Sequence, residues 1–192
     1  MLPKVWDKSI EEQIIEKWKN EVRETKGKKT IIIDTPPPYP APFWHIGAAL
    51  GYTLQDIIVR IFRMLGYKVI FPMGFDRNGI PVEWYVEKYE GIKISDVGRE
   101  KFLEICKTAL DKYVERMKFI LERMMISVDL KNPYFTDSEE YRALTQKTFI
   151  ELYKKGLIYE AERPSTFCPR CKTTIALSEI EREEKESTLY YI

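Results

Sequence analysis

The chain's only histidine, His45, lies between a proline-rich stretch and an apolar segment. A β-branched run over residues 30–34 is followed by prolines from Pro36 to Pro42, and His45-Ile-Gly47 opens the apolar segment. A strand, a turn and a helix start place helix N-terminal amides where they can point at an anion. Imidazole donates hydrogen bonds, and glycine lets a ligand approach the backbone closely. The pattern favours a phosphate-bearing ligand here over the alternative, a histidine satisfied by the backbone of an ordinary turn.

A second candidate, Asp76, lies in a loop bounded by Gly74 and Gly79, directly after an apolar run over 68–72. A carboxylate in that place can bind a cation such as a ligand's ammonium group. The alternative is an aspartate that serves only to form the turn. The binding interpretation gains weight if Asp76 and His45 share one cleft.

The third candidate is Cys168-Pro-Arg-Cys171, whose spacing is that of half a tetrahedral zinc site. The chain offers no second pair, and Cys106 lies on an apolar helix face, where we expect it in the core. A redox pair would need to begin a helix after a strand, and the Pro-Arg spacer favours a zinc knuckle instead. Cys168 and Cys171 are therefore predicted as metal ligands of a half site.

The elements that must position these residues follow from the apolar periodicity. A helix is predicted over 46–65, between strands over 30–34 and 68–72. A connection of this length implies parallel strands and a right-handed crossover. Because ligands in such sheets bind outside the carboxyl ends of the strands, we expect Asp34–Tyr39 and Met73–Asn78 to face each other across one cleft.

Further elements are predicted more coarsely. Ser9 with Glu12, and Asp137 with Glu140, have the spacing of capping boxes at helix starts. The predicted helices cover 7–25, 82–90, 95–124 and 138–155, and a short strand covers 157–159. Lys131-Asn-Pro-Tyr134 is interpreted as the end of the section that contains the long helix.

The bulk composition excludes several function classes. With 44% apolar and 32% charged residues, the 192-residue chain has the composition of a globular protein. Its net charge of +1 gives no global field for wrapping nucleic acid, so any such role needs a local surface or a part not present here. The N-terminus has no apolar signal segment. The longest uncharged run, Thr35 to Gln55, contains five prolines and is therefore a poor membrane span. With three cysteines indicating a reducing compartment, we expect a cytoplasmic protein.

Taken together, the motifs resemble those of the class I aminoacyl-tRNA synthetases. Pro36-Pro37-Pro38 followed by His45-Ile-Gly47 resembles the first signature of that family, and Gly74 to Glu83 resembles the strand-two motif of its valine, isoleucine and leucine branch. Further matches to this branch lie at Thr136–Tyr141, Thr145–Ile150 and Lys155–Tyr159. The triple proline and the cysteine knuckle, with Ala176–Glu181 after it, point to the valine enzymes of the archaeal type. The resemblance covers essentially the whole chain, in order.

The resemblance implies an α/β fold and a division of the chain. Residues 1–29 would form an N-terminal helical extension. Residues 30–160 would form the first half of a Rossmann-like catalytic domain with a parallel sheet. Residues 161–192 would hold a half zinc knuckle and the start of an editing insertion.

The implied activity is valine activation by ATP with Mg²⁺, followed by transfer to tRNA(Val). Valine's carboxylate attacks the α-phosphate, pyrophosphate leaves, and the adenylate acylates the terminal ribose. Such chemistry depends on positioning and charge stabilisation more than on covalent catalysis. Zn²⁺ is the further cofactor implied for the knuckle.

The resemblance also implies roles for individual residues. The ATP-binding positions would be His45, which is also catalytic, with Gly47 and Ala48. The amino-acid-binding positions would be Pro36, Pro37, Tyr39 and Asp76, with Asp76 on the ammonium group. Two positions depart from the family pattern: Ala48 stands where the signature normally ends in a second histidine, and Tyr39 stands where asparagine is commoner.

The family's second signature, a Lys-Met-Ser-Lys-Ser loop, does not occur in the sequence. Three hypotheses follow. The chain is an N-terminal catalytic segment that is incomplete without the remaining portion, which a partner chain could supply. Alternatively, it is a stand-alone paralogue that activates an amino acid without tRNA, or a non-catalytic remnant that binds ATP, an amino acid or another synthetase. The number and order of the motifs favour the first.

Overall fold

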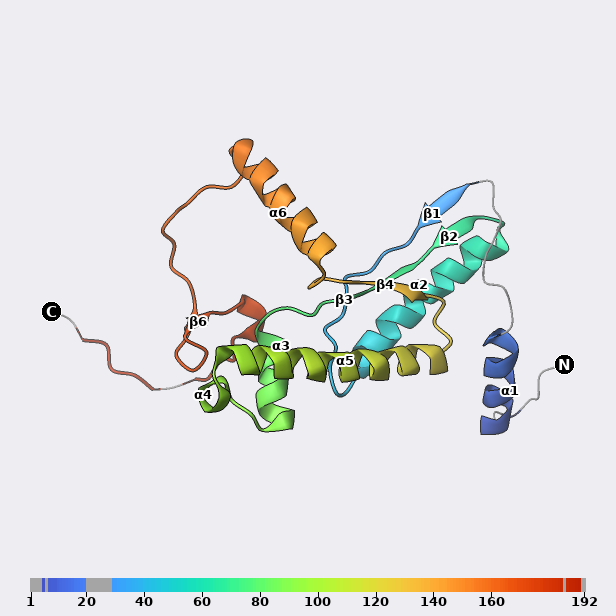
Figure 1. The fold of residues 1–192 in the computed structure, drawn as a ribbon, viewed down its shortest axis with the longest axis horizontal. Helices are drawn as coiled ribbons and strands as arrows, with labels where there is room; N and C mark the ends of the chain where they lie inside the picture. The colour runs from blue at the N-terminus through green and yellow to red at the C-terminus, as the bar shows by residue number, and fades with distance from the viewer. Residues whose placement is uncertain (1–4, 6, 20–28, 185, 191–192) are drawn as a thin grey trace. The chain divides into compact units, whose positions relative to one another are not determined.

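The computed structural model describes residue 5 and residues 7–19, 29–184 and 186–190. Contacts within the chain divide it into two compact units, Met1–Gln146 and Lys147–Ile192. Figure 1 gives the order of the elements along the chain. The parts of the predicted N-terminal extension at 1–4, 6 and 20–28 lie outside the described residues.

The strands of the first unit pair in parallel. β1 (Thr30–Ile32) pairs with β2 (Lys68–Ile70), and β3 (Pro72–Phe75) pairs with β4 (Asp129–Phe135). Phe71 alone separates β2 from β3, and its carbonyl accepts a hydrogen bond from the Asp129 amide at 2.9 Å. The parallel arrangement predicted from the strand–helix–strand pattern is confirmed.

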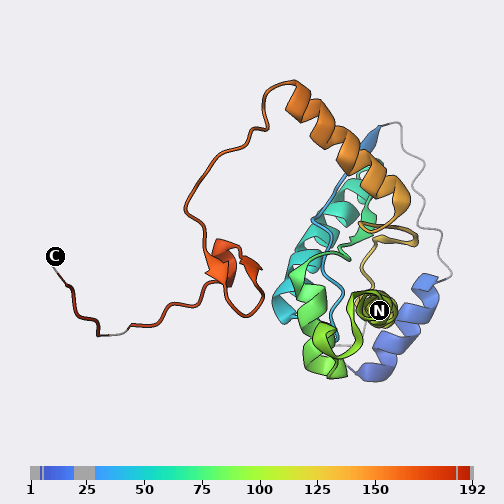
Figure 2. The ribbon, with the colours of Figure 1, turned by 60° about the vertical axis from the view of Figure 1, so that its left-hand side comes forward.

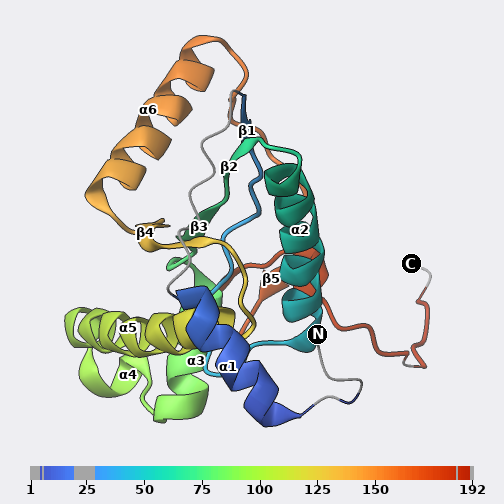
Figure 3. The same cartoon turned by 90° about the vertical axis from the view of Figure 1, so that its right-hand side faces the viewer.

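Helix α2 (Ile46–Met64) connects β1 to β2, close to the predicted range, and Gly66 follows it in the left-handed conformation at φ 81°. Tyr52 and Val59 from α2 pack with the strands in a buried core that also takes in α5 (Arg99–Arg123). Figure 3 shows α2 to one side of the strands and α5 to the other. The central core residues are Tyr52, Val59, Val69, Phe71, Met73, Phe75, Val114, Met117, Leu121, Ile126 and Val128.

All but one of the residues on the apolar face that the periodicity singles out on α2 are about half exposed or more: Leu50, Leu54, Ile57, Ile58, Ile61 and Leu65, with Ile46 at the helix start. The exception is Phe62, which is partly buried and packs against the core. The face against the strands carries Tyr52, Asp56 and Val59. A helix that is apolar on both sides is typical of one covered on both sides, and an exposed patch of this kind is typical of an interaction surface.

A second buried cluster joins α3 (Ile80–Tyr85) and the π-helical turn η1 (Val86–Glu90) to α5. Figure 2 shows α3 and α5 side by side. The predicted helix over 82–90 therefore forms, with a π-helical end. Gly98, at φ 78°, separates a four-residue helix α4 (Ile94–Val97) from α5, so the long helix starts later than predicted. Cys106 is buried in this cluster as expected, and burial raises the pKa of its thiol to about 11.

Strand β4 was not predicted, because Lys131-Asn-Pro-Tyr134 has the composition of a chain break. The register jumps from Pro72 opposite Asp129 to Gly74 opposite Tyr134. The Asp129 carboxylate accepts the backbone N–H groups of Lys131 and Asn132 at 3.0 and 3.2 Å, which closes the extra residues into a bulge. A proline inside such a bulge interrupts no ladder hydrogen bond.

Two predicted helix caps are wrong. Helix α1 (Lys8–Lys19) is capped by Asp7, whose carboxylate accepts the Ser9 amide at 2.8 Å, and hydrogen bonds from Ser9 lower the pKa of that carboxyl. Helix α6 (Glu139–Lys154) is capped by the Ser138 hydroxyl, which accepts the Tyr141 amide at 3.2 Å. In both cases the capping side chain belongs to the residue directly before the first helical residue, which is the N-cap position.

The second unit contains a small antiparallel hairpin of β5 (Phe167–Cys168) and β6 (Thr173–Thr174), and a 3₁₀ turn over Leu177–Glu179. The strand predicted over 157–159 does not form. Leu157 instead donates its amide to the Leu152 carbonyl at 3.1 Å, closing α6 beyond Gly156, which has φ 70°. None of the described helices is long and apolar enough to cross a membrane.

Candidate functional site

His45 is the N-cap of α2, and its ring turns back onto the first turn. Its Nδ1 accepts the Gly47 amide at 3.0 Å, so the neutral ring carries its proton on Nε2, which is then a hydrogen-bond donor. A side chain at Gly47 would place its Cβ 3.0 Å from Nδ1, so glycine is what allows this close approach. The amides of Ala48 and Ala49 both bond to the His45 carbonyl, at 3.0 and 3.2 Å. An anion that used the Gly47 amide would have to take the place of the imidazole.

The proline-rich segment and the Asp76 loop lie next to each other. The Asp76 amide donates to the Pro38 carbonyl at 2.9 Å, so the two segments predicted to meet at the carboxyl ends of the strands are joined directly. Pro36 and Tyr39 are exposed beside this bond, and Pro37 is half-buried. The predicted amino-acid-binding residues therefore gather around one backbone contact between the segments that follow β1 and β3.

Asp76 is held by Thr136, which directly follows β4, and by Asn78 of its own loop. Its Oδ1 accepts hydrogen bonds from the Thr136 hydroxyl at 3.0 Å and from the Asn78 amide at 3.2 Å. Its other oxygen, Oδ2, accepts no hydrogen bond within the described part of the chain. Thr136 was not predicted as a site residue, although it opens the quoted motif Thr136–Tyr141 directly after a strand.

The side chain of Arg77 anchors the same loop to α5 and to Asp137. Its side chain is only 10% exposed and forms ion pairs with Asp111 of α5 at 2.7 Å and with Asp137 at 3.1 Å. Its guanidinium also lies 5.4 Å from the ring centre of Phe135. Asp137, predicted as a helix cap, thus serves to anchor the loop that carries Asp76.

Two tyrosines lie near the ends of the strands at this site, Tyr52 against the proline-rich segment and Tyr134 against Gly74. The Tyr52 hydroxyl lies 3.5 Å from the Pro36 carbonyl, and burial raises its pKa to about 12. Burial, with the nearby Asp34 carboxylate, also raises the pKa of Tyr134. The Tyr134 ring lies directly over Gly74, where an added Cβ would come within 2.1 Å of it. Because their pKa values are raised, both phenols stay neutral at pH 7.

The cysteine knuckle is a tight hairpin. The Cys171 amide lies 3.5 Å from the Cys168 sulfur, and Lys172, in the left-handed conformation at φ 53°, donates its amide to the Cys168 carbonyl at 2.8 Å. Hydrogen bonds from the Cys171 and Arg170 amides lower the pKa of the Cys168 thiol, which favours the thiolate that binds metal. In the described ranges, no group of three or more His, Cys, Asp or Glu side chains is placed to hold a metal ion.

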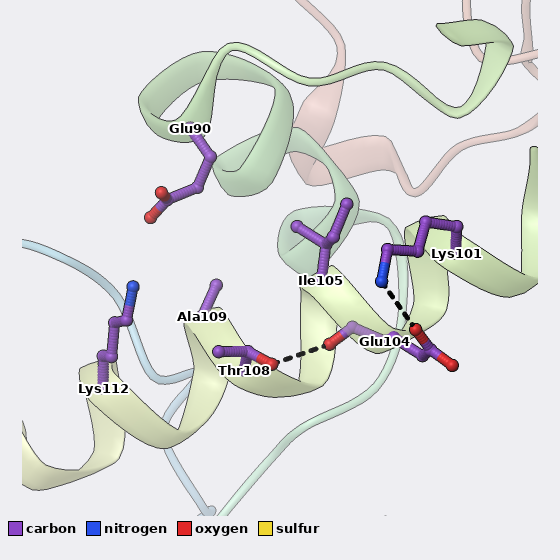
Figure 4. Close-up of a pocket in the computed structure, with 7 residues that line it drawn as sticks. All are labelled: Glu90, Lys101, Glu104, Ile105, Thr108, Ala109 and Lys112. Carbon is purple, nitrogen blue, oxygen red and sulfur yellow. Dashed lines mark hydrogen bonds and ion pairs between the residues drawn. The ribbon is translucent and has the colours of Figure 1, made fainter. Parts of the chain in front are cut away.

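An open pocket of about 210 Å³ lies between η1 and α5, and none of the predicted site residues lines it. Figure 4 shows its charged lining, with Glu90 on one element and Lys101, Glu104 and Lys112 on the other. The Lys101 ammonium pairs with Glu104 at 3.0 Å, and the Tyr113 hydroxyl donates to Glu90 at 3.2 Å. Both carboxylates of the lining are therefore already partnered within the protein.

The parallel strands, the capped helix and the ordered motifs define a class of protein. The sequence profile of the family "tRNA synthetases class I (I, L, M and V)" matches residues 4–192. The chain belongs to this family. The resemblance inferred from the motifs is confirmed.

Relatives narrow the similarity to the valine branch. The chain is 60% identical to the valine–tRNA ligase of Nanoarchaeum equitans over 167 residues, which cover 87% of this chain and 22% of that protein. It is 47% identical to the valine–tRNA ligase of Pyrobaculum aerophilum, covering 100% of this chain and 24% of that protein. The chain thus spans about a quarter or less of the length of these relatives.

A solved structure supports the α/β synthetase fold. The Agrobacterium radiobacter K84 agnB2 LeuRS, in a ternary complex with tRNA and LeuAMS, matches with a TM-score of 0.64 at 25% identity. The match covers 91% of this chain and 21% of that one.

Proposed function

We propose that the chain carries the first half of the valine-activating site of a valine–tRNA ligase. The observation that carries the proposal is the hydrogen bond from the Asp76 amide to the Pro38 carbonyl, at 2.9 Å. It joins a carboxylate suited to an ammonium group to the segment that leads into His45. The similarity to valine–tRNA ligases, described above, supports the choice of amino acid.

In this proposal, valine's ammonium group and its side chain are held by segments that follow two different strands. Asp76 binds valine's ammonium group through Oδ2, while Pro36, Pro37 and Tyr39 line the pocket for the side chain. The His45 Nε2–H donates to a phosphate oxygen of ATP at the start of α2, beside Gly47 and Ala48. With the carboxylate placed against the α-phosphate, attack releases pyrophosphate, whose charge Mg²⁺ balances.

Two further parts of the proposal concern the acceptor and the organisation of the chain. tRNA(Val) is the acceptor, and its contacts lie mostly outside residues 1–192. A second polypeptide segment, in the same or a partner chain, supplies the Lys-Met-Ser-Lys-Ser half of the ATP site. The enzyme is cytoplasmic. Its N-terminal extension is residues 1–29, its half catalytic domain is residues 30–160, and residues 161–192 hold the half zinc knuckle and the start of an editing insertion.

The test is amino-acid-dependent exchange of pyrophosphate into ATP, with the polypeptide expressed from the complete reading frame. We expect exchange with valine and slower exchange with threonine. Threonine has nearly the shape of valine, with a hydroxyl in place of a methyl group. A hydrophobic pocket favours valine over threonine by only about 10²-fold, the known limit for valine enzymes.

Each alternative has its own outcome in this assay. ATP binding without exchange for any amino acid would favour a non-catalytic remnant. Exchange that is fastest with an amino acid other than valine would favour a paralogue of different specificity. Isoleucine, which is one methylene larger than valine, is the third substrate to compare.

We also propose that Cys168 and Cys171 hold structural Zn²⁺ together with two ligands from outside residues 1–192. The lowered pKa of the Cys168 thiol fits a thiolate ligand. We expect zinc to remain after dialysis of the full polypeptide and to be lost in Cys168→Ser, as measured by elemental analysis. Cys106→Ala is the matched control and should keep its zinc. A wild-type polypeptide without zinc would contradict this assignment.

A further inference from the structure

One side-chain hydroxyl, that of Thr136, is bonded to three consecutive residues of the Asp76 loop. It donates to Asp76 Oδ1 at 3.0 Å, and it accepts the Arg77 amide at 2.9 Å and the Asn78 side-chain amide at 2.9 Å. A hydroxyl has one proton to donate and two lone pairs. All three are therefore in use, and the direction of the O–H is fixed toward the carboxylate.

The position of Thr136 is set by the sheet and not by the loop that it contacts. It directly follows β4, and its amide donates to the Phe75 carbonyl at 3.2 Å. Thr136 is only 7% exposed, so water does not compete freely for its hydroxyl. Asp76 and Thr136 lie 60 residues apart in the sequence, and the pairing of β3 with β4 brings them together.

This arrangement divides the two oxygens of Asp76 between different tasks. Oδ1 is held by the Thr136 hydroxyl and the Asn78 amide, while Oδ2 receives no hydrogen bond from the described residues. A carboxylate held at one oxygen keeps a defined direction for the other, so an ammonium group meets a preorganised partner.

We propose that Thr136 is a positioning residue for the amino-acid substrate, acting through Asp76. This inference rests on the proposed function, in which Asp76 binds the ammonium group. It goes beyond that function by assigning substrate affinity to a residue that need not touch the substrate. Without the hydroxyl, the carboxylate rotates and the affinity for valine falls, whereas the ATP side of the site at His45 is unaffected.

The experiment compares Thr136→Val, which keeps the shape and removes the hydroxyl, with Thr136→Ser, which keeps the hydroxyl. In valine-dependent pyrophosphate exchange with the full polypeptide, Thr136→Val should raise KM for valine by about 10- to 100-fold, the range for a lost hydrogen bond to a charged group. KM for ATP should change by less than about twofold. Thr136→Ser should restore KM for valine to near the wild-type value. Thr136→Ala serves if the valine variant does not fold.

Amide hydrogen exchange provides a readout that does not depend on activity. The Arg77 amide, which bonds to the Thr136 hydroxyl, should lose protection in Thr136→Val. The Asp76 amide, which bonds to Pro38, should keep its protection and serves as the internal control.

The outcomes separate the two proposals. Equal rises in KM for valine and ATP, or an unchanged KM for valine, would overturn the positioning role. If the wild type shows no valine exchange while Arg77 loses protection in Thr136→Val, the proposed function fails. The hydroxyl would then hold the loop for a structural reason alone, and the assignment to substrate would be overturned.

Discussion

Asp76→Asn should lower valine-dependent pyrophosphate exchange by about 10²- to 10³-fold, the range expected when one partner of a desolvated charge pair is removed. Asparagine keeps an oxygen that can accept the Thr136 hydroxyl and the Asn78 amide, so the loop should stay in place. What is lost is the negative charge that faces the ammonium group. The loss should appear mainly in KM for valine, measured by exchange at saturating ATP.

The matched control is Asp111→Asn. Asp111 pairs with Arg77 of the same loop, but its side chain is 68% exposed, and pairs of this kind contribute little. We expect less than about a threefold change in exchange. If Asp76→Asn behaved like Asp111→Asn, Asp76 would be a turn-forming residue, the alternative interpretation of its position, and valine would be held elsewhere.

Asp56→Ala should lower the free energy of unfolding of the first unit by about 3 kcal/mol, the lower end of the range for removing one partner of a buried pair. Asp56 is 4% exposed and accepts the Ser127 amide at 2.9 Å, the Ser127 hydroxyl and the Arg60 Nε at 2.7 Å. Alanine leaves the buried Ser127 amide without an acceptor. Arg60 is partly exposed and also bonds to the Met125 carbonyl, which limits the loss.

Urea unfolding followed by circular dichroism measures this effect as a lower midpoint with an unchanged slope. Glu115→Ala is the control, because Glu115 forms a surface pair with Lys118 at 2.8 Å and is 71% exposed. Its free energy of unfolding should change by no more than about 0.5 kcal/mol. Equal midpoints for the two variants would mean that the Asp56 contacts do not stabilise the fold.

The strand–helix–strand unit could be predicted from the sequence because its signals are local. The β-branched run ends in prolines, which cannot continue a strand. His45 and Gly47 form their cap within three residues, and Gly66 closes the helix in the left-handed conformation. The ordered motifs were also sufficient to predict the class I synthetase family, which the sequence profile confirms.

The roles of individual helix faces and caps were less predictable. The apolar stripe of α2 marks a helix, but both of its sides are apolar, so periodicity alone does not decide which side packs on the strands. Asp137 has the type and spacing of a cap, yet it pairs with Arg77, while Ser138 takes the cap. A residue that suits two roles is assigned by its neighbours in space.

By itself, the sequence determined the family, the β1–α2–β2 unit and the candidate residues at His45 and Asp76, because each depends on residues a few positions apart. The tertiary structure alone decided the pairing of β3 with β4, through a bulge that has the composition of a chain break. That pairing brings Thr136 to Asp76 across 60 residues of sequence. No local pattern encodes such a contact, since it exists only when the strands have found their register.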